Sequence, residues 1–130
     1  MEIAIDFDGT CVTHEYPKVG RDIGAQQVLK RLADAGHSLI LYTMRCDGAN
    51  ADGRDDYSKP LSDAVNWFKK NDIPLYGIQS NPTQREWTTS PKCYAQLYID
   101  DAALGCPLIH GQHERPYVDW DKVNEMLFAA

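Results

Sequence analysis

The hydrophobic positions along the chain predict strands that alternate with helices. Five short apolar runs are largely unbroken by polar residues, which is typical of strands buried on both faces of a parallel sheet. These runs span residues 2–6, 38–43, 75–79, 96–100 and 107–110. Strands separated by helical segments of ordinary length predict an α/β fold with a doubly wound parallel sheet.

Three segments carry apolar residues at helical spacing, and each has a residue suited to its start or end. Gly36 is placed to end the first helix, Pro60 to begin the second, and Asp119 to cap the third. The apolar positions, in chain order, are Ala25, Val28, Leu29 and Leu32, then Leu61, Ala64, Val65 and Phe68, then Trp120, Val123 and Leu127.

The chain shows no repeat, low-complexity tract or linker, so we predict one domain over residues 1–130. Right-handed crossovers place the carboxyl ends of parallel strands at one edge of the sheet. Segments 11–20, 45–57 and 80–91 are expected to be loops over that edge. The middle segment is rich in Gly, Asn and Asp, and both an ordinary solvated connection and a small lid fit it.

Charge and cysteine content narrow the class of protein. A net charge of −6 argues against a protein whose main function is to bind nucleic acid or an anionic membrane. The four cysteines have no spacing typical of zinc ligands, and a chain of this length needs no disulfide framework. Met1 leads directly into the first predicted strand, and no apolar run approaches membrane-spanning length. We therefore expect a cytoplasmic protein.

Acidic residues stand where two of the predicted strands end. Asp6 and Asp8 close the first strand, and Asp100 and Asp101 close the fourth. Because these strand ends share one edge of the sheet, the carboxylates are expected to lie close together. Ligands bind at this edge in open α/β sheets. Carboxylates so close repel one another, so a divalent cation is expected among them.

These residues resemble the four motifs of the haloacid dehalogenase (HAD) superfamily of Mg²⁺-dependent phosphatases. The run Asp6-Phe7-Asp8-Gly9-Thr10 matches the first motif, Thr43 the second, Lys92 the third and Asp100-Asp101 the fourth, in the same order and spacing. The run 6–20 also resembles small uncharacterised bacterial and phage members. The resemblance implies a Rossmann-like core of about five strands in the order 5-4-1-2-3.

The resemblance also implies a role for each matching residue. Asp6 would attack phosphorus as the nucleophile, and Asp8 would act as general acid and then as general base. Mg²⁺ would be held by Asp6, the backbone carbonyl of Asp8, and Asp100. Thr43 and Lys92 would hold the phosphoryl oxygens.

Other residues near these motifs have more than one interpretation. Asp101 fits a water-mediated metal ligand or an orienting group, and Thr10 a similar supporting role. Arg45 fits a substrate contact or an ordinary surface residue. His14 and Tyr16 could frame the pocket or form a turn. A calcium loop is excluded because Cys11 stands where such a loop needs glycine.

Stretches 7–42 and 44–91 are each mostly occupied by a predicted helix, strand and loops, so neither has room for the cap domain common in HAD proteins. A capless site is either open or closed by loop 45–57 or by a neighbouring subunit of a homo-oligomer. The acidic net charge favours a small phosphorylated metabolite as substrate. The alternatives are a nucleic-acid end phosphatase and a non-catalytic, metal-binding regulatory module on the same fold.

Overall fold

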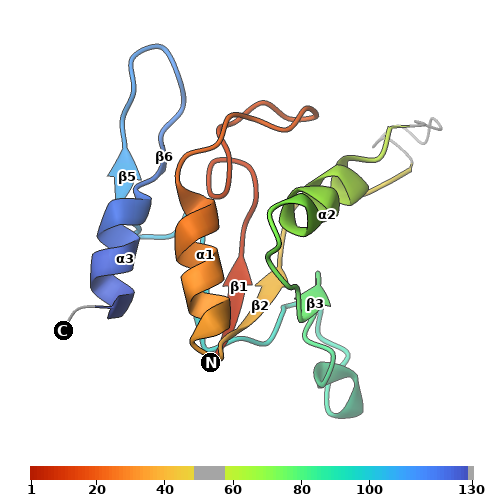
Figure 1. Ribbon diagram of the computed structural model, residues 1–130. Coiled ribbons are helices and arrows are strands. Elements are labelled where there is room, and N and C mark those ends of the chain that lie inside the picture. The colour runs from red at the N-terminus through yellow and green to blue at the C-terminus, as the bar shows by residue number, and fades with distance from the viewer. Residues whose placement is uncertain (49–57, 129–130) are drawn as a thin grey trace.

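The computed structural model describes residues 1–48 and 58–128 and contains a four-stranded parallel sheet (Figure 1). Its strands are β1 (Glu2–Ile5), β2 (Ser38–Leu41), β3 (Gly77–Ile78) and β4 (Leu97–Ile99). The order is β3-β2-β1-β4, and every pairing is parallel. The predicted α/β fold with a parallel sheet is confirmed, and these four strands lie in the expected relative order.

The fifth predicted strand does not join this sheet. β5 (Leu108–Ile109) instead pairs antiparallel with β6 (Tyr117–Val118), which the sequence did not predict, in a separate two-stranded sheet. β6 is tied to the turn after β1, because the N–H of Val118 donates to the carbonyl of Gly9 at 3.0 Å. The prediction for 107–110 was therefore right about an extended segment and wrong about its partner.

All three predicted helices are present, as α1 (Ala25–Asp34), α2 (Pro60–Lys70) and α3 (Trp120–Phe128). Gly36 lies just past the end of α1 with a left-handed φ of 92°, as a helix stop requires. Asp119 caps α3 as expected, since its Oδ1 accepts from the N–H of Lys122 at 3.2 Å.

One face of the sheet is covered by all three α-helices. A single buried cluster joins Ile5 and Leu41 of the sheet to Leu29 of α1, Phe68 of α2 and Val123 of α3. Figure 1 shows α1 next to β1 and α3 beside α1, and α1 and α3 are in contact. The fold therefore places its main core between the sheet and this helical layer.

The opposite face of the sheet differs from the doubly wound expectation. Ala4 and Ile40 are covered there by Cys93 and Ala95, from a segment whose helical content in the described residues is one 3₁₀ turn, η1 (Gln84–Glu86). The topology explains this: β1, β2 and β3 follow one another in one direction, so right-handed crossovers put α1 and α2 on the same face. The connection from β3 to β4 runs back across the other face and carries no α-helix.

Among the described residues, no domain is inserted between β1 and β2 or between β2 and β3. No helix within 1–48 and 58–128 is both long enough and apolar enough to cross a membrane. All four cysteines are free thiols, with Cys11 and Cys93 buried. The predicted lid, 45–57, lies mostly outside the described residues.

Candidate active site

The candidate site lies where β1 ends. The N–H of Asp6 donates to the carbonyl of Ile99 at 3.0 Å, so the tip of β1 stays attached to β4. Phe7 is fully buried, and its carbonyl accepts from the N–H groups of Thr10 and Cys11 at 3.1 and 2.7 Å. The chain thus leaves the strand in a tight turn that holds Asp6 at the edge of the sheet.

Gly9 allows this turn to form. Its φ of 78° lies in the left-handed region that side chains disfavour. A Cβ at this position would also collide with the His14 ring and the Asp101 carboxylate. Glycine is therefore needed here both for the backbone conformation and for the close approach of two polar side chains.

The structure brings three carboxylates together at the ends of β1 and β4. Asp6, Asp100 and Asp101 each present an oxygen, and these oxygens lie within 4.8 Å of one another. The buried Thr10 links them: its hydroxyl donates to Oδ2 of Asp6 at 2.7 Å and accepts from the N–H of Asp101 at 3.1 Å. The expected proximity of the two acidic strand ends is confirmed.

Asp6 is strongly perturbed by these surroundings. Burial raises its pKa to about 8, with repulsion from Asp100 and Asp101 adding to the rise and the Thr10 hydrogen bond opposing it. Without a compensating cation, the cluster therefore holds a proton near neutral pH. The donor set is made of carboxylate oxygens, which suit Mg²⁺ or Ca²⁺ better than softer metals.

His14 completes one side of the cluster. Its Nε2 lies 2.8 Å from Oδ2 of Asp101, and both side chains are largely buried. Of the two interpretations left open by the sequence, this contact places His14 at the site. Tyr16 lies farther out, with most of its surface exposed.

Asp8 is held apart from the three clustered acids. Its carboxylate faces Arg45, with Nε donating to Oδ2 at 2.8 Å and Nη2 to Oδ1 at 2.7 Å. Of the two sequence interpretations of Arg45, the ordinary surface residue is wrong, because Arg45 is buried. All of its guanidinium N–H groups donate to protein oxygens in this structure, and the substrate contact stays a prediction.

Thr43 lies at the tip of β2, in a loop held by Gln79. The N–H of Thr43 donates to Oε1 of Gln79 at 2.8 Å, and Nε2 of Gln79 donates to the carbonyls of Thr43 and Arg45 at 2.7 and 3.0 Å. The Thr43 hydroxyl accepts from the N–H of Arg45 at 3.1 Å. Gln79 was not singled out by the sequence analysis, because it has no signal beyond its position at the end of a predicted strand.

Lys92 is not brought into contact with the acids. Its ammonium lies 5.6 Å from the centre of the Tyr98 ring, on an exposed side chain, and no hydrogen bond or ion pair within 1–48 and 58–128 joins it to the three carboxylates. The backbone of Lys92 is fixed by Ser90 and Gln84. Its predicted contact with phosphate stays a prediction.

Trp120, predicted only as a core position of the last helix, also supports the site. Its indole N–H donates to the carbonyl of Thr10 at 2.7 Å, and its side chain is buried. The start of α3 thereby fixes the turn that carries Asp6.

The comparison with solved structures finds a conserved protein from Bacteroides thetaiotaomicron. The two sequences are 32% identical, the match covers 98% of this chain and 88% of that chain, and the TM-score is 0.73. This chain belongs to that protein's family. The family therefore shares the α/β fold over nearly the whole of both chains, while the description of the Bacteroides protein names no substrate or reaction. A scan against protein-family models finds no match, and a search of curated proteins finds none.

Proposed function

We propose that this protein is a Mg²⁺-dependent phosphomonoester hydrolase of the HAD type. The observation that carries the proposal is the cluster of Asp6, Asp100 and Asp101 at the sheet edge, with Asp8 nearby but turned away from it. One carboxylate at the cluster and a second held separately match a reaction that needs a nucleophile and a proton donor.

The residues present fit a magnesium ion. Asp6, Asp100 and Asp101 supply oxygen ligands, and the high pKa of Asp6 reflects burial among like charges that a cation would neutralise. When bound, Mg²⁺ supplies charge stabilisation for an anionic phosphoryl group beside an anionic nucleophile.

The two catalytic carboxylates would then act in turn. An oxygen of Asp6 forms a bond to phosphorus while the bond from phosphorus to the leaving oxygen breaks, and Asp8 gives its proton to that oxygen. In the second half, Asp8 takes a proton from water as the water oxygen attacks phosphorus. The bond between Asp6 and phosphorus breaks, inorganic phosphate leaves, and both acids return to their starting states.

A small phosphorylated metabolite is the proposed substrate class. The described residues contain no cap over the site, and the net charge of −6 disfavours a polyanionic substrate. Panel assays of phosphorylated sugars, nucleotides and oligonucleotides separate this class from nucleic-acid ends.

The decisive experiment measures phosphate release from that panel with Mg²⁺ and with EDTA. Wild type is expected to release phosphate only with Mg²⁺, and Asp6→Asn to lose at least about 1,000-fold in kcat, because the nucleophile is gone. Asp63→Asn is the matched control: it removes a carboxylate from the exposed surface of α2 and should keep full activity. No Mg²⁺-dependent release by wild type, or equal rates for wild type and Asp6→Asn, would contradict the proposal.

A further inference from the structure

Arg45 is a buried cation whose hydrogen-bonding capacity is fully used. Besides its two bonds to Asp8, its Nη1 donates to the carbonyls of Pro17 and Pro60, each at 3.1 Å, and its Nη2 to the carbonyl of Lys18 at 2.7 Å. Only 1% of its side chain is exposed. Every guanidinium N–H therefore has a protein acceptor.

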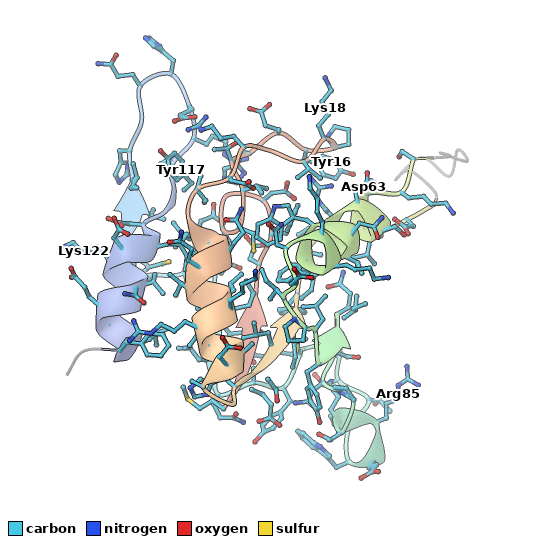
Figure 2. All side chains as sticks on the ribbon, viewed as in Figure 1. Tyr16, Lys18, Asp63, Arg85, Tyr117 and Lys122 are labelled. Atoms are coloured by element: carbon cyan, nitrogen blue, oxygen red, sulfur yellow. The ribbon has the colours of Figure 1, made fainter. Side chains whose placement is uncertain are left out.

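The partners of Arg45 come from three separate parts of the chain. They are the turn after β1, the loop at 17–18, and the first residue of α2. Aromatic rings pack beside the same guanidinium, Phe7 at 4.9 Å and Tyr16 at 5.3 Å from the ring centre. Figure 2 shows Tyr16 and Lys18 on the loop that lies toward α2. One side chain thus fixes the position of Asp8 relative to its surroundings.

A buried ion pair of this kind is poor evidence for stability alone. Removing two charges from water costs several kcal/mol, which is roughly what their attraction returns. Apolar residues of similar volume in place of such a pair often stabilise a protein just as much. The arginine must therefore be explained by what it does to its partner. Here that partner is the second carboxylate of the candidate site.

We propose that Arg45 is a positioning residue for the hydrolysis, because it holds the carboxylate of Asp8 in one orientation and out of the Asp6, Asp100 and Asp101 cluster. This inference rests on the proposed function. Because Arg45 binds the carboxylate of Asp8, that carboxylate does not become another ligand of a bound cation. About 18% of the Asp8 side chain remains exposed, and each of its oxygens keeps a further lone pair for a proton.

Asp8 acts in both halves of the proposed reaction, but only its first proton transfer depends on the leaving group of the substrate. Asp8 gives its proton to the leaving oxygen as the bond from that oxygen to phosphorus breaks, so its placement matters most when the leaving oxygen is a poor leaving group. An alkyl phosphate needs that proton, whereas a nitrophenyl phosphate leaves as a stable phenolate and needs it little. A merely structural arginine would affect both esters equally.

The test compares kcat/KM, which reports the first half of the reaction, on an alkyl phosphate and on p-nitrophenyl phosphate for wild type, Arg45→Lys, Asp8→Asn and the double variant. Lysine keeps the charge but cannot form the two-pronged pair. We expect kcat/KM of Arg45→Lys on the alkyl phosphate to fall about 10-fold to 100-fold further than its kcat/KM on p-nitrophenyl phosphate. Asp8→Asn should show the same selectivity, and the double variant should be no more selective than Asp8→Asn.

The exposed pair of Arg21 and Glu114, at 3.1 and 3.2 Å, offers a matched control. Arg21→Lys weakens a similar two-pronged contact on the protein surface and should change neither rate. Because the readout is a ratio of two rates on one preparation, a reduced folded fraction cancels. If Arg45→Lys does not fold, the neutral pair Arg45→Gln with Asp8→Asn is compared with Asp8→Asn alone.

The outcomes separate the two proposals. Equal loss on both esters, or a double variant that is more selective than Asp8→Asn, would overturn the positioning role while leaving the phosphatase intact. A wild type that hydrolyses neither ester with Mg²⁺, nor any member of the substrate panel, would instead contradict the proposed function itself.

Discussion

The carboxyl group of Asp6 has surroundings and a pKa unlike those of an aspartate on the protein surface. It is buried beside two other acids, and its pKa of about 8 compares with 3.8 for an unperturbed aspartate. In the folded protein Asp6 keeps its proton over a range in which the unfolded chain has already lost it. Folding is therefore linked to pH.

We predict that the metal-free protein loses stability as the pH rises from about 4 to about 8. Over that range the folded state binds more protons than the unfolded state, so the free energy of unfolding falls with pH, by up to a few kcal/mol at about 1.4 kcal/mol per pKa unit. Thermal unfolding of wild type and Asp6→Asn in EDTA measures this pH dependence. Subtracting the pH dependence of Asp6→Asn from that of wild type removes the contribution of the four histidines.

Mg²⁺ should reverse the effect, raising the melting temperature of wild type more at pH 8 than at pH 5, because the metal competes with the proton on Asp6. Asp6→Asn should show a smaller response. Identical pH slopes in the two proteins would contradict the raised pKa of Asp6.

Some residues of the site could be predicted from sequence and others could not. Asp6 and Asp100 were predictable neighbours, because the ends of adjacent parallel strands meet at one edge regardless of side-chain detail. The burial of Arg45 was not predictable, since three of its acceptors are backbone carbonyls of residues 17, 18 and 60. Carbonyls are present at every position, so no sequence pattern marks the ones that will receive a guanidinium.

At the scale of an element, the turn after β1 depends on one glycine. We predict that Gly9→Ala lowers the free energy of unfolding by at least about 2 kcal/mol, because it combines left-handed strain of roughly 1–2 kcal/mol with a collision against His14 and Asp101. Denaturant unfolding and Mg²⁺ binding by calorimetry check this, and both should weaken.

Gly36→Ala is the matched control for that change. Gly36 has a similar φ of 92°, but open space surrounds the position of a Cβ. Gly36→Ala should cost only the backbone strain, roughly 1–2 kcal/mol, with Mg²⁺ binding unchanged. Equal effects of the two substitutions would show that the close approach at Gly9 does not matter.

The helices were predicted better than the last strands for a physical reason. A helix satisfies its own backbone, so the spacing of its apolar residues is enough to place it. A strand needs a partner, and residues 107–110 had two available: the free edge of β4 and the segment that became β6. Hydrogen bonds of Val118 to Gly9 and of Asp119 to Pro107 favour the second partner, and the first of these bonds depends on the turn after β1 being formed.

At the scale of the whole molecule, the candidate site is completed from distant parts of the chain. We predict that Trp120→Phe costs about 1–3 kcal/mol of stability, because the buried carbonyl of Thr10 loses its partner while the aromatic packing is largely kept. It should also weaken Mg²⁺ binding, since Thr10 holds Asp6. Unfolding and calorimetry measure the two effects on the same protein.

Trp67→Phe provides the comparison for Trp120→Phe. Trp67 is also nearly buried and donates its indole N–H to Asp22 at 3.1 Å. A similar loss of stability is expected, but Mg²⁺ binding should be unchanged because that bond does not reach Thr10. Weakened binding in both variants would assign the effect to general loosening of the core.

The doubly wound prediction, with helices on both faces of the sheet, was correct for one face only. The main core formed as expected because its apolar positions repeat at regular spacing in strands and helices. The opposite face is covered by an irregular segment held by side-chain contacts such as Gln84 with Tyr94 and Lys92. Contacts of this kind have no periodicity, so the absence of an α-helix there could not be foreseen.

The bond from Trp120 to the turn at Thr10 has a consequence for how the protein is made. A ribosome delivers residues 6–10 long before residues 100–101, and residue 120 later still. β1 and α1 can pack together early. The three acids cannot lie together until residues 100–101 are made, and the turn at Thr10 cannot be held by Trp120 until α3 has begun to emerge. During synthesis, the metal site should therefore be among the last features to form.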